Sequence, residues 1–202
     1  QALAEIFSTM GDWGGLIAAY ERRAELGQTR ELKIESLHKA AEIARSKAKD
    51  RAETARIFKV LVALSPADAK ANETLDEYYT ETQNWGELIL VLESQLERRT
   101  AAGETDMALL QRLAKISEEG LRDENRAIRY YERLIELAPQ NRRALDALAR
   151  IFESTERWTE FVEVTRRLVK VTKDRNVKAL LYFKCGSVME AKFGREQDAI
   201  RY

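Results

Sequence analysis

The stretch that decides the fold runs from Arg126 to Trp158 and reads RAIRYYERLIELAPQNRRALDALARIFESTERW. Its apolar residues recur at every third or fourth position, which is the spacing of one buried helix face. Ala127 and Tyr131 lie on a first stripe that ends before Pro139, and proline cannot continue a helix. Leu148, Phe152 and Trp158 mark the next stripe. The stretch therefore predicts a helix, a turn and a second helix.

The same pattern recurs along the chain at a nearly constant interval. Trp13, Trp85 and Trp158 follow one another at this interval, and the same interval separates Pro66 from Pro139. The period of about 73 residues has room for four helices, which make two helical hairpins. We therefore expect a single solenoid composed of three super-repeats, at residues 1–66, 67–139 and 140–202. Both chain ends fall inside a repeat, so we expect a slice of a longer array.

Read with this period, the chain is all-α, with about twelve antiparallel helices and no strand. The expected helices are Ala2–Met10, Trp13–Leu26, Arg30–Lys47, Arg51–Leu64, Ala69–Thr82, Trp85–Arg99, 106–120, Glu124–Leu137, Arg142–Ser154, Trp158–Val171, Asp174–Phe193 and a twelfth from about Arg195. Side chains that can accept from free N–H groups are expected to cap several of these helices. The expected caps are Thr29, Asp50, Asp68, Thr105 and Asp123.

Composition excludes several classes of function. The 34 Lys and Arg residues balance the 34 Asp and Glu residues, so nothing suggests general nucleic-acid binding. A single histidine and a single cysteine leave no basis for a metal or cofactor site or for a nucleophilic active site, and no disulfide can form within the chain. The longest apolar runs are far too short to span a bilayer. We expect a cytoplasmic protein that is not an enzyme and does not insert into membranes.

The repeat resembles the tetratricopeptide repeat, or TPR, and looks most like divergent bacterial arrays of that family. Ala127, Tyr131 and Pro139 match the family pattern of a second helix, and Thr54, Phe58 and Pro66 match it in the preceding copy. The resemblance implies a right-handed α-α superhelix whose stacked first helices form a groove for peptides. The family's early tryptophan is absent from the first helices.

Three residue types outside this pattern have structural interpretations. The tryptophans begin equivalent helices, so we interpret them as core wedges rather than ligand platforms. His38 follows Leu37 on a first helix, so its side chain is expected to face solvent or the groove. Cys185 lies on a packing stripe and is expected to be a buried, unreactive thiol.

The groove of the first helices is the expected binding site for a peptide or protein partner. Counted from the aligned leucines, the groove-facing residues are His38, Glu42, Arg45, Glu73, Glu77, Gln111, Lys115, Asp146, Arg150 and Glu153. Their mixed charges lack the residues with which TPR domains hold chaperone tails. We therefore predict a non-catalytic interaction scaffold. Two alternatives stay open, namely a regulatory or targeting segment of a larger enzyme and a helical repeat of the RNA-processing type.

Overall fold

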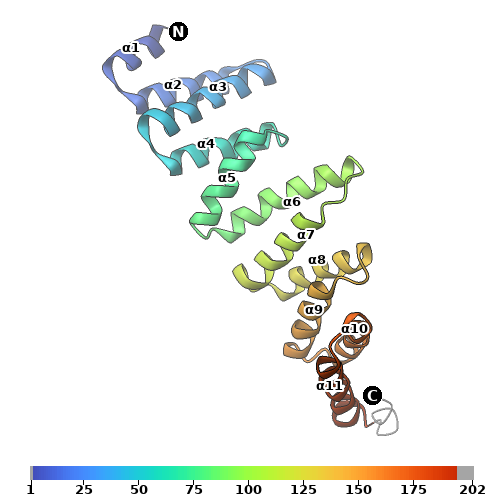
Figure 1. Cartoon of the computed structure of the whole chain (residues 1–202). Coiled ribbons are helices and arrows are strands. Elements are labelled where there is room, and N and C mark those ends of the chain that lie inside the picture. Colours follow the sequence, from blue (N-terminus) through green and yellow to red (C-terminus); the bar gives the residue numbers. More distant parts are fainter. Residues whose placement is uncertain (1, 195–202) are drawn as a thin grey trace. The chain divides into compact units, whose positions relative to one another are not determined.

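The computed structural model describes residues 2–194, and every regular element within them is helical (Figure 1). The first half contains α1 (Ala2–Met10), α2 (Trp13–Leu26), α3 (Arg30–Ile43), α4 (Arg51–Leu64), α5 (Ala69–Glu81) and α6 (Trp85–Ala101). The second half contains α7 (Met107–Lys115), α8 (Glu124–Leu137), α9 (Arg142–Ser154), α10 (Trp158–Val171) and α11 (Arg175–Phe193). The predicted all-α class without strands is thus confirmed for the described residues. The predicted twelfth helix near Arg195 lies outside them.

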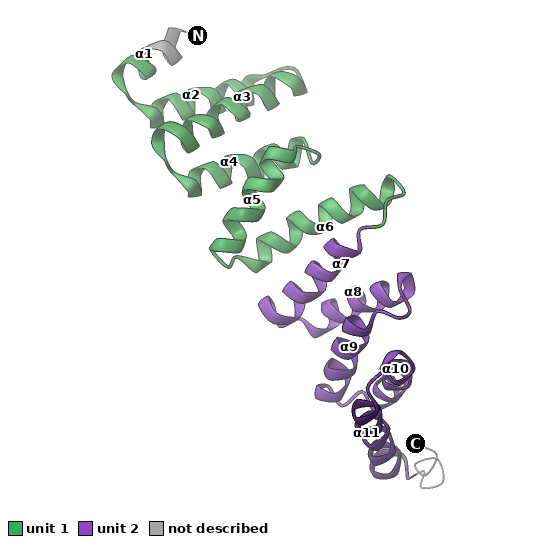
Figure 2. Cartoon of the chain, in the orientation of Figure 1, with its two compact units in different colours: residues 1–105 green, residues 106–202 purple. Residues whose placement is uncertain are grey.

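The chain forms two compact units, Gln1–Thr105 and Asp106–Tyr202 (Figure 2). Within each unit, every helix packs against the next helix of the chain. This succession of helical hairpins is consistent with an α-α superhelix. The division after Thr105 falls inside the second predicted super-repeat. The single solenoid and its three super-repeats therefore stay a prediction.

Four of the five predicted side-chain caps are present. Thr29, Asp50, Asp68 and Asp123 each accept a hydrogen bond from the backbone N–H three residues ahead. The prediction of Thr105 as a cap was wrong by one residue, because Asp106 caps α7 by accepting from the Leu109 N–H at 2.9 Å. A carboxylate is favoured there over a hydroxyl because it also faces the positive end of the helix dipole.

The period of the sequence is present in the backbone as well. Helix α3 ends in a π-helical turn, η1 (Ala44–Ala48), and α7 ends in an equivalent turn, η2 (Ile116–Gly120). A left-handed residue follows each turn, Lys49 with φ 55° and Arg122 with φ 54°. Since a π-turn advances by about one extra residue, it rotates the side chains that follow it relative to an α-helix.

The core consists of side chains that recur at this period. Leu75 and Leu148 are both fully buried, and so are Ala71 and Ala144 at the start of the same helices, α5 and α9. Small residues at these positions let neighbouring helices approach closely, and the leucines fill the space between them. The repeat therefore sets the same packing in both units.

The tryptophan prediction needs a correction. Trp13, Trp85 and Trp158 are each half-buried, and none belongs to the buried core. Each opens its helix, and side chains in the first turn of a helix point back toward its N-terminus, partly out into solvent. Their exposed faces attract cations: the ammonium of Lys47 lies 5.9 Å from the ring centre of Trp13, and that of Lys192 lies 5.0 Å from that of Trp158.

Candidate functional site

A small cleft of about 100 Å³ lies in unit 2 among α7, η2, α8 and α9. Helices α7 and α9 are both first helices of their hairpins, so the cleft lies on the face predicted to bind a partner. It brings together three of the predicted groove residues, Gln111, Lys115 and Arg150. The remaining lining residues are Glu118, Glu119, Tyr131, Leu134, Asn141, Arg143 and Ala144.

Glu118 connects three elements at the base of this cleft. Its Oε2 accepts a hydrogen bond from the Tyr131 hydroxyl of α8 at 2.9 Å, and its Oε1 forms an ion pair with Nη1 of Arg150 of α9 at 2.7 Å. The Glu118 side chain is 10% exposed, whereas that of Arg150 is 65% exposed. Burial, reinforced by the hydrogen bond to Glu118, raises the pKa of Tyr131. The hydroxyl therefore stays protonated and donates, which fixes one carboxylate oxygen and leaves the guanidinium at the surface.

The rim of the cleft is basic. The ammonium of Lys115 lies 3.7 Å from a carboxylate oxygen of Glu119, a loose pair at the surface. Arg143 is exposed and forms no hydrogen bond or ion pair with another described residue. Two cations, Arg143 and Lys115, are thus available to an incoming group at low cost, because neither has to leave a buried partner.

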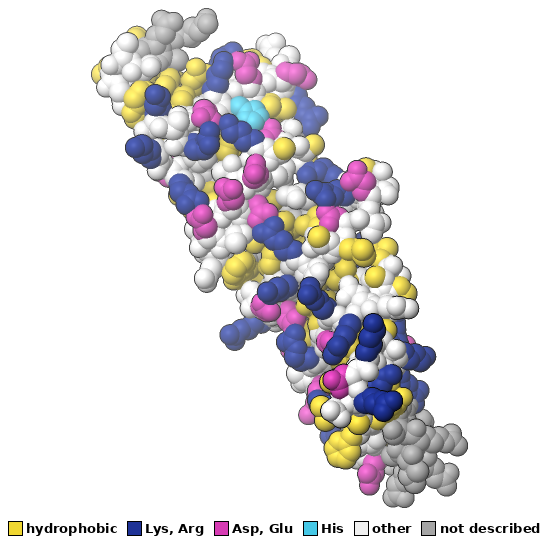
Figure 3. All heavy atoms as spheres, in the orientation of Figure 1, with side chains coloured by type: hydrophobic (Ala, Val, Ile, Leu, Met, Phe, Trp, Pro, Cys, Tyr) yellow, Lys and Arg dark blue, Asp and Glu magenta, His cyan; other side chains and the backbone are white. Residues whose placement is uncertain are grey.

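In unit 1 the equivalent face is closed by the chain's own ion pairs. His38 lies within 2.7 Å of the Asp68 carboxylate, which also caps α5. Glu42 accepts hydrogen bonds from Lys70 at 2.7 Å and from Arg45 at 3.0 Å, and these contacts lower the pKa of Glu42. Figure 3 shows His38 at the surface of unit 1 beside charged side chains. The His38 side chain is 33% exposed, so only part of its ring reaches solvent.

The other predicted groove residues do not line this cleft. Glu73 and Glu77 are exposed on α5. Asp146 lies on α9 beside Arg142, with 3.5 Å between their charged atoms. Glu153 pairs with Lys184 of α11 at 2.9 Å, so it connects two first helices of successive hairpins. That the ten groove residues contact a partner stays a prediction.

Sequence reasoning missed Glu118 and Tyr131, which hold the cleft together. Tyr131 was interpreted only as the large packing residue of its hairpin, although a buried tyrosine hydroxyl needs a partner. Glu118 lies inside η2, where the π-turn shifts side chains relative to the α-helical count used for Gln111 and Lys115. Assigning residues to a face by α-helical spacing therefore gives the wrong direction for Glu118 unless the position of the π-turn is known.

The remaining reactive groups of the described residues are tied into the structure. Cys185 is 1% exposed, and burial raises the pKa of its thiol, as expected of an unreactive cysteine. Among residues 2–194, no group of three or more His, Cys, Asp or Glu side chains is placed to hold a metal ion. No described helix combines the length and apolar character required to cross a bilayer.

The succession of short antiparallel hairpins, with the binding face predicted on their first helices, defines a helical-repeat protein. Comparison with known families agrees: a tetratricopeptide-repeat model matches residues 1–34 and 144–179. The chain is thus a helical-repeat protein, and these two segments resemble the tetratricopeptide repeat.

Solved structures with similar folds include two of MamA. The MamA AMB-1 structure has a TM-score of 0.51 at 13% identity and covers 85% of this chain and 88% of its own; this likeness shows the fold. A second MamA structure has a TM-score of 0.48 at 17% identity, covering 84% and 87%. YrrB, a TPR protein with an unusual peptide-binding site, has a TM-score of 0.48 at 16% identity, covering 82% and 80%. No curated protein matches the sequence.

Proposed function

We propose that the chain is a non-catalytic interaction scaffold that binds a peptide or protein segment in the cleft among α7, η2, α8 and α9. The proposal rests on an available cation at the rim of the cleft, Arg143, and on polar side chains at its floor that are held in place. Arg143 has no partner within the described chain, while Tyr131 and Arg150 are held by Glu118. Fixed polar groups beside an available cation favour binding, because little side-chain entropy is lost when a partner docks.

The absence of a catalytic role is part of the same proposal. Its support is the state of the two side chains best suited to nucleophilic or general-base chemistry. Cys185 is buried with a raised thiol pKa, and the His38 ring contacts the Asp68 carboxylate that caps α5. Cytoplasmic location and bacterial origin stay predictions, as do the enzyme-segment and RNA-processing alternatives.

The test is an affinity pull-down with the intact chain, followed by titration of each identified partner in purified form. Arg143→Glu removes an available cation without breaking an internal contact, so the fold is expected to persist. We expect its partner affinity to fall about tenfold or more, which corresponds to at least about 1.4 kcal/mol. Arg133→Glu is the matched control, since Arg133 is exposed on α8 and does not line the cleft.

Equal affinity of wild type and Arg143→Glu for every partner would place binding on another surface.

A second pair of variants uses the repeat itself. Glu77 occupies in unit 1 the position that Arg150 occupies in unit 2, one period later. Arg150→Glu should weaken binding, whereas Glu77→Arg should leave it within about twofold, because Glu77 does not line the cleft.

A further inference from the structure

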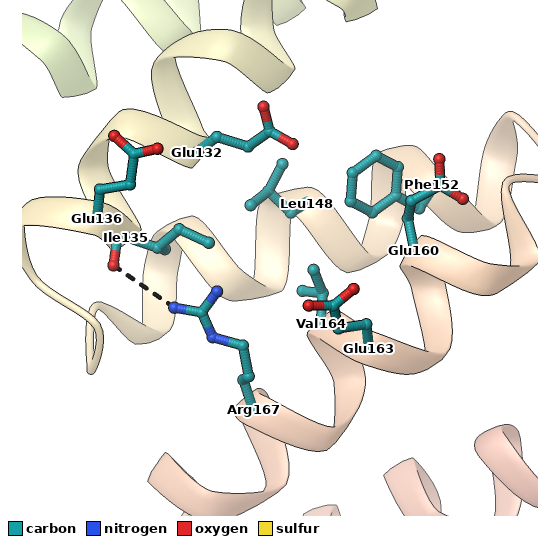
Figure 4. Close-up of a pocket in the computed structure, with 9 residues that line it drawn as sticks. All are labelled: Glu132, Ile135, Glu136, Leu148, Phe152, Glu160, Glu163, Val164 and Arg167. Atoms are coloured by element: carbon teal, nitrogen blue, oxygen red, sulfur yellow. Dashed lines mark hydrogen bonds between the residues drawn. The ribbon is translucent and has the colours of Figure 1, made fainter.

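A larger cavity, of about 400 Å³, lies in the same unit among α8, α9 and α10. Helices α8 and α9 also border the cleft, but no residue lines both the cleft and this cavity. Its volume is within the roughly 300–1,000 Å³ of ligand-binding pockets. Figure 4 shows the apolar side chains that line it together with one guanidinium and a set of carboxylates. The apolar side chains are Ile135, Leu148, Phe152 and Val164.

The charges around this cavity are almost all negative. Glu132 and Glu136 come from α8, and Glu160 and Glu163 from α10. The single cation, Arg167, donates to the backbone carbonyl of Ile135 at 3.5 Å (Figure 4). This hydrogen bond joins α10 to α8, and the guanidinium group points to a backbone oxygen and not to one of the carboxylates. Carboxylates gathered over apolar walls produce a local negative potential that attracts cations.

Most of these carboxylates have no partner in the described chain. Glu160 forms an ion pair with Arg157 at 2.7 Å. Glu132, Glu136 and Glu163 are exposed and form no hydrogen bond or ion pair with another described residue. The cavity thus has three uncompensated acidic groups around an apolar wall.

In unit 1 the equivalent second helices are joined by an ion pair, because the chain itself supplies the cation. There the ammonium of Lys59 on α4 meets the carboxylate of Glu87 on α6 at 2.7 Å, bridging two second helices. The equivalent residues of unit 2, one period later, are Glu132 and Glu160. Two carboxylates cannot form that bridge. In unit 2, therefore, Glu132 takes the position that Lys59 has in unit 1.

We propose that the α8–α10 cavity binds a lysine side chain from a basic, amphipathic segment of a partner protein. The ammonium takes the place between Glu132 and Glu160 that corresponds to that of Lys59 beside Glu87. The aliphatic part of the lysine lies along Ile135 and Val164, the two apolar lining residues that keep some exposure, as long cationic side chains commonly lie on apolar surfaces. Glu136 and Glu163 attract further basic residues of the same segment. This second surface is independent of the cleft of the first helices.

The experiment uses three fluorescein-labelled peptides that differ only at one set of positions. The first carries leucines and lysines at helical spacing, and the second and third carry glutamine or glutamate in place of lysine. Fluorescence anisotropy with the full chain should show binding of the lysine peptide and an affinity at least about tenfold lower for the other two. Equal affinity for the lysine and glutamine peptides would overturn the proposal.

Two variants with the same change in net charge locate the site. Glu132→Lys places an ammonium opposite Glu160, as in unit 1, so the fold is retained and the lysine peptide should bind at least about tenfold more weakly. Glu190→Lys changes an exposed residue of α11 that does not line the cavity, and binding should stay within about twofold. If Glu190→Lys weakens binding as much as Glu132→Lys, the attraction is general and the cavity is not the site.

Methyl NMR spectra give a readout that does not depend on affinity. Saturating lysine peptide should shift the methyl signals of Val164 and Ile135 and leave those of unit 1 in place. Shifts confined to other residues would overturn the proposal, and so would displacement of the peptide by Mg²⁺ with the same Val164 shifts, which would indicate a metal site. Arg143→Glu should not change lysine-peptide affinity, which separates this proposal from the one for the cleft.

Discussion

Unit 1 and unit 2 are built from the same repeat, but they differ in the charges of equivalent side chains on neighbouring helices. In unit 1, Glu42 pairs with Lys70 across α3 and α5, and Lys59 pairs with Glu87 across α4 and α6. At the equivalent positions one period later, the first pair becomes Lys115 and Arg143, and the second becomes Glu132 and Glu160. Each complementary pair is thus replaced by two like charges.

This difference separates what the repeat needs for folding from what it can vary. The buried residues that recur, such as Leu75 and Leu148, have the same burial in both units. Surface ion pairs contribute only about 0–1 kcal/mol each, so losing them costs little stability. Unit 2 can therefore leave Arg143 at the cleft, and three carboxylates at the cavity, without an opposite charge from the described chain while keeping the fold. A partner can supply the opposite charges.

The largest effect is expected where the two units are alike. Leu75→Ala and Leu148→Ala should each lower the free energy of unfolding by about 2–5 kcal/mol, because both remove a fully buried side chain and leave a cavity. Urea unfolding of the two variants measures this. Leu90→Ala, at a 57% exposed position, is the control and should change stability by less than about 1 kcal/mol. A large difference between the Leu75 and Leu148 variants would mean that the two cores are not equivalent.

A smaller effect tests the base of the cleft, at the position where the two units differ by a single hydroxyl group. Phe58 is the unit 1 counterpart of Tyr131, so Tyr131→Phe makes unit 2 resemble unit 1. The variant loses the hydrogen bond to Glu118 and should unfold with about 0.5–1.5 kcal/mol less free energy. Thermal and urea unfolding measure the loss. Unchanged stability together with unchanged partner affinity would show that the Tyr131 hydroxyl does not organise the cleft.

The reverse change gives unit 1 the acidic face of unit 2. Lys59→Glu breaks the ion pair with Glu87 and places two carboxylates across α4 and α6. Because the Lys59 side chain is 57% exposed and that of Glu87 is 32% exposed, we expect a loss of only about 0.2–1 kcal/mol, decreasing further at high salt. The pair with Glu87 raises the pKa of Lys59. In the wild type the contribution is therefore complete below pH 10.5, the ordinary value, and disappears as the pH rises through the raised pKa. A loss independent of salt would point to packing rather than charge.

Much of the fold could be predicted from the sequence because helix boundaries depend on local chemistry. Apolar spacing, Pro66 and Pro139, and capping side chains such as Asp50 determine where helices begin and end. The half-buried state of Trp85 could not be predicted, since it depends on the direction of a side chain at a helix start.

The site was less predictable because it depends on contacts between helices. Gln111, Lys115 and Arg150 were assigned to the groove from spacing, and they do line one cleft. Glu118 was missed because its direction depends on the π-turn η2. The α8–α10 cavity was missed because Glu132 and Glu160 lie on different helices. In the sequence each is an ordinary charged residue on the solvent side of its helix, and only the folded structure brings both to one cavity.

The smallest expected effect concerns the turns that precede the tryptophans. Gly11, Gln83 and Glu156 occupy equivalent positions with φ of 68°, 53° and 56°, so only the first copy has a residue suited to the left-handed region. That conformation costs a non-glycine residue about 1–2 kcal/mol, and the greater freedom of glycine in the unfolded chain offsets about 0.5–1 kcal/mol of any gain. Glu156→Gly and Gln83→Gly should therefore each stabilise the chain by about 0.5 kcal/mol in urea unfolding. Gly11→Ala is the opposite change: a Cβ there meets nothing within 4 Å, so the change in stability is the backbone strain less the entropy that alanine removes from the unfolded chain. If Gly11→Ala costs nothing, the strain of the left-handed conformation does not exceed the entropic cost of glycine, and the gain expected from glycine in the other two turns disappears.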